Sequence, residues 1–489
     1  MSNDKTVKNF KKPTFGLSVL ALGSIVLSLF FCIMVFKTVS IQVGLLLGIF
    51  FITLISKKLG YDFNDLMKFM GESVGESAFG LWFFIAIGAI IGSWMAAGTV
   101  PAIIYYGLGI ISPKVFLPAG LILCSITALC TGTSWGTIGT VGIALVGIGQ
   151  GLGIPLPVTA GMVISGAAFG DKMSPVSDTP NLTSMTAGAD LYESIKAFIQ
   201  TMTPAYIISL VMFTLLGLKY GGGGGNLAVI EETRNVIAAN FNLNPIVILP
   251  IVILLVLNLR KFPSLPAMTI AVISGLAIAI IFQGMSLPAA LEVINSGFSI
   301  DTGSSYVDPI LNRGGIQRML WTFSVAFMAL SMGGILNKVG YMEALIADLI
   351  KRVKTVGQLS LVVMLSSMLS SAAFGEAYLS FILNGTLYRE EFDKRGLNRA
   401  MLARLVSEGG LMMTPLMPWT TFGAFAATTL GVSGFAFAPY AFLNYLCPIV
   451  SVAMSYMGIA VVWNNKANKG KKKFSDIDLS DEPERVETA

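Results

Sequence analysis

Long apolar stretches recur along almost the whole chain, and short polar segments separate them. A helix of about 20 apolar residues is long enough to cross a hydrocarbon core of about 30 Å. Lipid cannot form hydrogen bonds with backbone N–H and C=O groups, so these groups must pair within the segment. Each stretch is therefore predicted to be α-helical. The clearest stretches cover residues 14–36, 39–56, 79–97, 115–130, 155–169, 206–218, 245–259, 266–282, 319–336, 359–374 and 435–463. The pattern predicts an all-α, polytopic membrane protein of about 12 helical segments.

A glycine-rich and polar segment near the middle divides the chain. Five consecutive glycines at 221–225 precede the polar stretch 226–244, a composition typical of a flexible linker. The last residues are charged and poor in apolar side chains, which predicts disorder. We therefore expect a first membrane half at 1–220, a linker at 221–244, a second membrane half at 245–463 and a disordered cytoplasmic tail at 464–489.

Each half contains two interrupted apolar stretches. The interruptions lie at 132–137 and 170–179 in the first half, and at 371–376 and 411–420 in the second. The later interruption of each half contains a methionine, a hydroxyl-bearing residue and a proline in a row. Many transporters consist of two related halves with broken helices and a binding site near the bilayer midplane. We expect two inverted repeats with broken helices near the midplane.

Composition supports a membrane protein and predicts its orientation. Hydrophobic residues make up 54% of the 489 positions, charged residues only 12%, and the mean hydropathy is +0.76. An average soluble domain carries about 25% charged residues. The net charge of +5 comes from basic clusters beside apolar stretches, which fits the positive-inside rule and gives no sign of nucleic-acid binding. We expect a multi-pass protein of the cell membrane with both termini cytoplasmic.

Two kinds of site are disfavoured by residue usage. The chain contains no histidine, so no imidazole can bind a metal, act as a base or relay a proton. Its four cysteines lie in apolar stretches without CxxC spacing, which argues against a disulfide framework or a zinc site. No cofactor is expected.

Two aspartates lie in the first half's later interruption. An aspartate inside a membrane costs about 2.5–3.5 kcal/mol, so it normally faces a cavity or a partner. Asp171 and Asp178 are therefore candidate sites for Na⁺ and protons, and nearby prolines disfavour a continuous helix. Further oxygen ligands are Ser174, Ser177, Thr179 and Asn181. Alternatively, Asp178 is a surface loop residue or a helix cap, and Lys172 is either a salt-bridge partner of one aspartate or a snorkelling lysine.

The earlier interruption fits a G-x-S-x-G pattern around Ser134, which in other settings marks a serine hydrolase. Apolar helical surroundings and the absence of histidine argue against an enzyme. Two interpretations stay open: close helix packing through Gly132 and Gly136, or cation coordination by Thr133, Ser134 and Thr137.

Two glutamates in the second half could bind ions or carry protons. Glu376 and Glu408 lie beside small residues in apolar surroundings, although Glu408 could equally form a surface ion pair with the basic stretch 389–404. Thr414 and Thr420 lie at the later interruption and add hydroxyl ligands.

At these residues the chain resembles the NhaC-type sodium/proton antiporter family. The resemblance is carried by WMAAGTVP at 94–101, GTSWGT at 132–137, the specific string FGDKMSP at 169–175 and SDT at 177–179. Weaker matches are GEAY at 375–378 and PWTT at 418–421. It implies an inverted-repeat secondary transporter that exchanges Na⁺ for H⁺, with some relatives exchanging organic acids. The chain departs from the family where relatives carry a His soon after Asp190, and where Glu408 precedes two glycines.

These observations predict a mechanism. Asp178 and Asp171 bind either Na⁺ or H⁺, and the loaded site alternates between the two membrane faces. The alternative is a sodium- or proton-coupled transporter of a small organic acid, of malate or lactate type, or of an amino acid. The expected partners are the lipid bilayer, Na⁺ and H⁺, and an organic anion and a homodimer are left open.

Overall fold

The computed structural model describes residues 10–36, 40–110, 112–221, 226–260, 262–304, 307–351 and 353–476. Across these ranges the chain is helical almost throughout, and β-type pairing is limited to isolated bridges. The all-α prediction is confirmed. The helices up to the middle of the chain are α1 (Phe15–Phe30), α2 (Ile41–Lys57), α3 (Phe63–Glu76), α4 (Ala78–Ala96), α5 (Thr99–Ile110), α6 (Pro113–Thr131), α7 (Ser134–Thr137), α8 (Ile143–Gly151), α9 (Leu156–Met173), α10 (Asp178–Ala187), α11 (Leu191–Gly221) and α12 (Asn226–Asn240). The later helices are α13 (Leu249–Leu259), α14 (Ser264–Ile281), α15 (Leu287–Ser296), α16 (Asp308–Leu311), α17 (Ile316–Val339), α18 (Tyr341–Ile350), α19 (Val356–Phe374), α20 (Ala377–Lys394), α21 (Arg399–Gly410), α22 (Thr421–Leu430), α23 (Gly434–Phe437) and α24 (Phe442–Met457).

Several helices have the length and composition of membrane spans. In the described part of the chain, α6, α11, α17 and α19 qualify individually, and up to 7 spans result if each of three bent helix pairs counts as one. The bent pairs are α3 with α4, α12 with α13 and α22 with α23. Shorter apolar helices include α1, α2, α5, α14 and α24. These three bends lie between Glu76 and Gly80, between Asn240 and Pro245, and between Leu430 and Gly434, apart from the four interruptions noted in the sequence.

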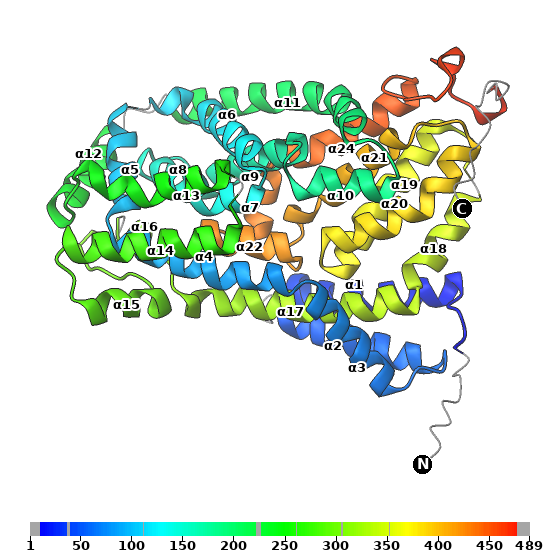
Figure 1. Cartoon of the computed structure of the whole chain (residues 1–489), viewed down its shortest axis with the longest axis horizontal. Coiled ribbons are helices and arrows are strands. Elements are labelled where there is room, and N and C mark those ends of the chain that lie inside the picture. The colour runs from blue at the N-terminus through cyan, green and yellow to red at the C-terminus, as the bar shows by residue number, and fades with distance from the viewer. Residues whose placement is uncertain are drawn as a thin grey trace.

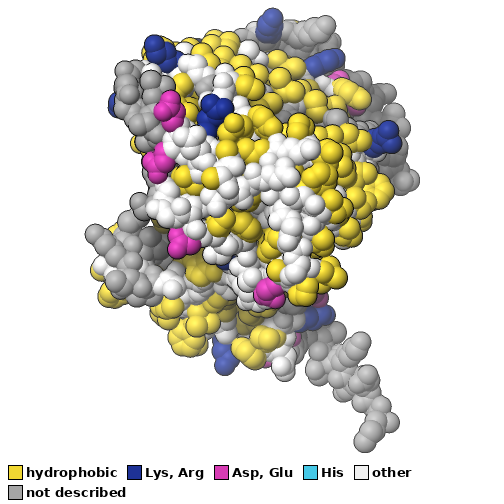
Figure 2. Space-filling model, turned by 90° about the vertical axis from the view of Figure 1, so that its left-hand side faces the viewer, with side chains coloured by type: hydrophobic (Ala, Val, Ile, Leu, Met, Phe, Trp, Pro, Cys, Tyr) yellow, Lys and Arg dark blue, Asp and Glu magenta, His cyan; other side chains and the backbone are white. Residues whose placement is uncertain are grey.

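Large apolar side chains cover the outer faces of the helices. On α11, Ile207, Val211 and Leu215 are each more than half exposed. Figure 2 shows broad hydrophobic surface with only scattered charged side chains on the face in view. Soluble monomers rarely expose apolar patches larger than a few hundred Å², so the apolar outer face of α11 fits contact with lipid.

The longest helices run roughly parallel along the long axis of the molecule (Figure 1). Helix α17 packs against α2, α3 and α4, whereas α6 packs against α9 and α11. Between these groups, α10 of the first half packs against α20 and α21 of the second half. The broken helices of both halves therefore meet in the interior of the bundle.

The structure differs from the predicted linker and tail. Residues 226–240 form α12, which packs against α5 and α8 instead of remaining a flexible linker. In the predicted tail, residues up to Asp476 are described; the Val356 N–H donates to the Lys472 carbonyl at 3.1 Å, and Arg395 lies 4.3 Å from the ring centroid of Phe474. Backbone pairing and a cation–π contact thus order a segment whose composition predicts disorder. Residues 477–489 lie outside the described ranges.

The last apolar stretch, 435–463, forms two helices instead of one. Helix α23 and a short 3-10 turn end at Tyr440, and α24 begins at Phe442. Pro439 interrupts the helical hydrogen bonding there.

Candidate functional site

Asp171 lies where the two interruptions of the first half meet. It belongs to the last turn of α9 and is 5% exposed. One carboxylate oxygen accepts the Ser134 hydroxyl at 2.5 Å and the Ser134 N–H at 3.3 Å, and the other accepts the Ser177 hydroxyl. Ser134 begins α7 and Ser177 is the N-cap of α10. The carboxylate therefore joins the N-terminal ends of two helices, where helix dipoles stabilise negative charge.

The local sequence explains why both helices break here. Gly132 ends α6 in the left-handed conformation, with φ of 70°, and a Cβ at this position would lie 3.1 Å from the carbonyl carbon of Val176. Only glycine tolerates both the backbone conformation and the close approach. The Thr133 hydroxyl then accepts the Gly136 N–H at 3.3 Å, and the Ser177 hydroxyl accepts the Thr179 N–H at 3.1 Å. Both half-helices therefore begin with side-chain caps.

Glu376 occupies a corresponding place in the second half. It is the N-cap of α20, follows Gly375 in the left-handed conformation, and accepts the Ala377 N–H at 2.9 Å. Its other carboxylate oxygen accepts the Thr421 hydroxyl at 2.6 Å. Thr421 begins α22, and its N–H donates to the Gly375 carbonyl at 2.8 Å. Glu376 thus joins α20 to α22 as Asp171 joins α7 to α10.

The Tyr378 phenol lies near both carboxylates, and the residue is 41% exposed. It lies in the first turn of α20, and its side chain interacts with Thr179 at the start of α10. The phenol also lies within electrostatic reach of Asp171, Glu376 and Asp178. Packing of α10 against α20 therefore brings the first-half and second-half candidates near one tyrosine.

The other predicted residues take supporting positions. Asp178 is exposed and is the first residue of α10, whereas Ser177 is the cap. The side chains of Thr137, Ser174, Asn181, Thr414 and Thr420 each donate a hydrogen bond to a backbone carbonyl. These bonds hold the interrupted segments in place.

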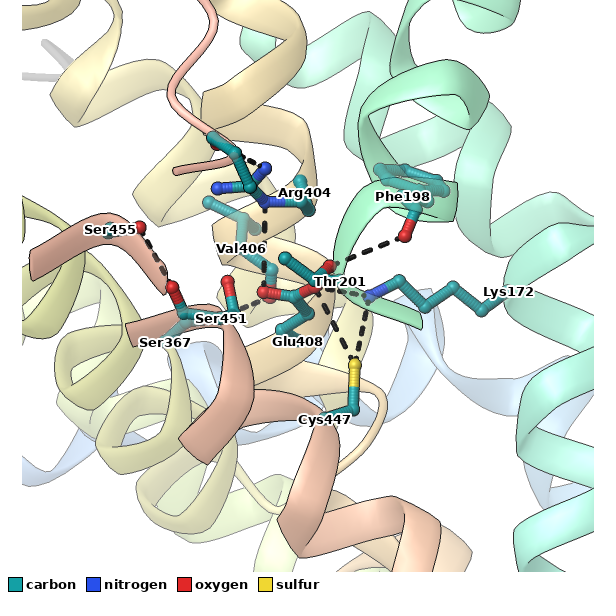
Figure 3. A network of polar contacts seen from close by, with 11 residues as sticks. Lys172, Phe198, Thr201, Ser367, Arg404, Val406, Glu408, Cys447, Ser451 and Ser455 are labelled. Atoms are coloured by element: carbon teal, nitrogen blue, oxygen red, sulfur yellow. Dashed lines mark hydrogen bonds and ion pairs between the residues drawn. The ribbon is translucent and has the colours of Figure 1, made fainter. Parts of the chain in front are cut away.

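Lys172 pairs with Glu408 and with neither aspartate (Figure 3). The Lys172 amino nitrogen lies 3.1 Å from a Glu408 carboxylate oxygen, and both side chains are 0% exposed. The surface ion pair considered for Glu408 is therefore a buried one. The Ser134 hydroxyl donates to Asp171, whereas Lys172 lies with Glu408.

The charge balance at Asp171 and Glu376 favours a cation. Among the described residues, no basic side chain forms an ion pair with either carboxylate. The described residues also contain no cluster of three or more His, Cys, Asp or Glu that could hold a metal. Carboxylate and hydroxyl oxygens in small number suit a weakly held, exchangeable cation more than a resident metal.

Sequence reasoning missed several residues of these networks. Tyr378 lies two positions after Glu376, and Arg404 lies four before Glu408 on the same helix face, a spacing that could have indicated a pair. Thr201 donates its hydroxyl to Glu408 at 2.5 Å from α11, and no local signal in the sequence points to this contact.

A sequence model of the Na⁺/H⁺ antiporter family matches residues 7–195 and 166–459 of the chain. Three relatives are similar along nearly their full length. A malate-2H⁺/Na⁺-lactate antiporter of Bacillus subtilis (strain 168) is 35% identical over 465 residues, 95% of this chain and 99% of the relative. The Na⁺/H⁺ antiporter NhaC of Alkalihalophilus pseudofirmus is 33% identical over 455 residues, 92% and 97% of the two chains. The arginine/ornithine antiporter ArcD of Halobacterium salinarum is 34% identical over 451 residues, 92% and 93%.

Proposed function

This chain belongs to the Na⁺/H⁺ antiporter family, and on that premise we propose that it exchanges Na⁺ for H⁺ across the cell membrane. The observation that carries the proposal is the pair of carboxylates, Asp171 and Glu376, at the ends of four half-helices without a basic partner among the described residues. A buried carboxylate is costly when charged and unpaired, so it favours taking up a cation. Either Na⁺ or H⁺ meets that need.

Asp171 and the hydroxyls of Ser134 and Ser177 would hold the cation in the first half. These groups already converge on one point, and each hydroxyl oxygen can turn from donating to Asp171 to binding Na⁺. Glu376 with Thr421 would provide the corresponding oxygens in the second half. Broken helices supply such oxygens without a continuous helix having to unwind.

Mutual exclusion couples the two ions. A proton on Asp171 removes the negative charge that binds Na⁺, and bound Na⁺ disfavours protonation. If the site crosses the membrane only when loaded, each inward Na⁺ requires an outward H⁺, or the reverse. This is alternating access with competition at buried carboxylates, the mechanism of a secondary transporter.

Proteoliposomes with an acid interior test the exchange. Adding NaCl should raise the internal pH, whereas an equal concentration of choline chloride should not. Asp171→Asn should abolish the NaCl response, and Glu193→Gln, an exposed acid on α11, should retain it. Full exchange by Asp171→Asn would overturn the site, and no NaCl response from the unmodified chain would overturn the function.

A second candidate is coupled movement of an organic acid or amino acid. It is supported by the names of two relatives, a malate/lactate antiporter and an arginine/ornithine antiporter, which are as similar as the Na⁺/H⁺ antiporter. The same proteoliposomes distinguish the candidates when malate, lactate or arginine is added with NaCl. A pH response that requires one of these solutes would favour the second candidate. A homodimer stays a prediction.

A further inference from the structure

A second cluster of buried charges lies next to the cation site, and the proposed exchange does not use it. Two cations, Lys172 and Arg404, face one carboxylate, Glu408, and all three side chains are 0% exposed (Figure 3). Lys172 lies on α9 of the first half, whereas Arg404 and Glu408 lie on α21 of the second half. The carboxylate can therefore pair across the two halves or within its own helix.

The pairing of Glu408 is one-sided. One carboxylate oxygen lies 3.1 Å from the Lys172 amino nitrogen. The same oxygen accepts the Thr201 hydroxyl at 2.5 Å and the Cys447 thiol at 3.6 Å. The other oxygen has no hydrogen-bond partner, and the Arg404 Nε lies 4.0 Å from it. An unpartnered buried carboxylate oxygen is unfavourable, so this arrangement leaves a second interaction available.

Arg404 is equally under-partnered. Its Nη1 donates to the Ala460 carbonyl at 2.7 Å, but its Nε and Nη2 have no hydrogen-bond partner. A guanidinium can bind a carboxylate through two N–H groups at once. A small rotation of Glu408 toward Arg404 would satisfy the free oxygen and the free donors together, and separation of Lys172 from Glu408 would then leave the carboxylate paired with Arg404.

We propose that Lys172, Glu408 and Arg404 are positioning residues that form a partner-exchange latch between the two halves. Glu408 holds Lys172 in the conformation described here, and pairs with Arg404 when the ends of α9 and α21 separate during transport. The inference rests on the proposed function, because Asp171 precedes Lys172 in the last turn of α9 and moves with it. Two arrangements of the same charges that differ by one ion pair form a two-state element.

Because two cations face one carboxylate, either cation can be removed without leaving Glu408 unpaired. We call the latch closed when Glu408 pairs with Lys172 and open when it pairs with Arg404. Lys172→Met leaves Glu408 with Arg404 and should hold the latch open. Arg404→Met leaves Glu408 with Lys172 and should hold it closed. A role in packing alone would give both variants the same direction of change, whereas the latch predicts opposite directions. Replacing Glu408 would leave two buried cations, so this variant is unsuitable.

Native Cys447 reports the state of the latch. Its thiol is buried and donates to Glu408, whereas Cys124 is equally buried in α6, away from the cluster. The full chain in proteoliposomes would be treated with N-ethylmaleimide. Peptide mass spectrometry would then measure how fast each cysteine is alkylated. Lys172→Met should speed alkylation of Cys447 by about tenfold, Arg404→Met should slow it, and Cys124 should not change. Equal rates at Cys447, or changes in one direction, would overturn the latch.

Transport kinetics provide the second measurement. Arg404→Met should lower the maximal Na⁺ uptake rate by about fivefold with little change in KM, because a closed latch slows the conformational step. Lys172→Met should raise KM by about fivefold, because α9 loses its anchor beside Asp171. Lys196→Met, an exposed lysine on α11, serves as the matched control. Similar kinetics in both latch variants would count against the proposal.

The two proposals fail separately. Alkylation of Cys447 requires no ion movement, so it still reports on the latch if the unmodified chain exchanges no Na⁺ for H⁺. In that case the proposed function is wrong whatever the alkylation shows. Normal exchange, combined with Cys447 alkylation rates that are the same in both variants and in the unmodified chain, would refute only the latch.

Discussion

The indole ring of Trp135 stacks on the ring of Phe425, with centroids 4.3 Å apart and an interplanar angle of 22°. Trp135 lies in α7 of the first half, and Phe425 lies in α22 of the second. The N-terminal ends of these half-helices contact Asp171 and Glu376. A direct aromatic contact therefore connects the helix that contacts Asp171 with the helix that contacts Glu376. Movement of one of these half-helices must displace the other.

Trp135→Ala should weaken Na⁺ binding as well as the fold. Truncating a buried aromatic side chain costs about 3–5 kcal/mol, and we expect the lower end because Trp135 is half-buried. We expect a lower unfolding temperature in detergent and a KM for Na⁺ raised about threefold. Trp321→Ala is the control, because Trp321 is 51% exposed on α17. A destabilised Trp135→Ala protein with unchanged KM would show that the contact serves stability alone.

Ser177→Ala should impair the cation site more than Ser134→Ala. The Ser177 hydroxyl donates to Asp171 and also caps α10, whereas the backbone N–H of Ser134 still reaches Asp171 after loss of its hydroxyl. Each lost hydrogen bond to a charged group costs about 1.5–3 kcal/mol, and the lost cap adds about 1 kcal/mol. Na⁺ uptake at several Na⁺ concentrations measures both KM values, with Thr127→Ala as the control, because the Thr127 hydroxyl donates to the Leu123 carbonyl within α6. Equal KM values in the two serine variants would contradict the dual role of Ser177.

The first-half site was accessible from the sequence because its signals are local. Asp171, Ser174 and Ser177 lie within seven residues, and Pro175 predicts the break between them. Comparing the two interruptions left Ser134 open between helix packing and cation coordination, and the structure shows its hydroxyl donating to Asp171. Asp178, the leading candidate, is exposed at the start of α10, because one position in a helix cap decides whether a side chain faces inward.

The contacts between the halves could not be predicted in the same way. Lys172 and Glu408 are 236 positions apart, and nothing near Lys172 distinguishes Glu408 from Asp171 or Asp178 as its partner. The choice depends on how α11 packs against both α9 and α21, which is a tertiary property. Tyr378 likewise looks like any first-turn aromatic residue until α10 lies beside α20.

Lowering the pH on the side from which Na⁺ enters should raise the apparent KM for Na⁺ and leave the maximal rate unchanged. Lowering the pH protonates the carboxylate that binds Na⁺, so Na⁺ must displace a proton and the apparent affinity falls. Once the site is mostly protonated, each further pH unit should raise KM about tenfold. Initial rates of radioactive sodium uptake between about pH 6 and about pH 9 measure this dependence. A maximal rate that falls at constant KM would mean that the titrating group does not bind Na⁺.

Gly132→Ala should destabilise the protein through the break between α6 and α7. Gly132 has a φ of 70°, and left-handed backbone costs an alanine about 1–2 kcal/mol. The added Cβ would also approach the backbone of Val176 and Ser177 at 3.1–3.2 Å, so the segment that positions Asp171 must shift. Gly16→Ala is the matched control, because Gly16 lies in helix α1 with no atom within 4 Å of the added Cβ. In that helix alanine is favoured over glycine by about 1 kcal/mol, so the control should be neutral or stabilising. Thermal unfolding in detergent and the KM for Na⁺ should both worsen for Gly132→Ala only, and equal behaviour of the two variants would contradict the tight crossing at Asp171.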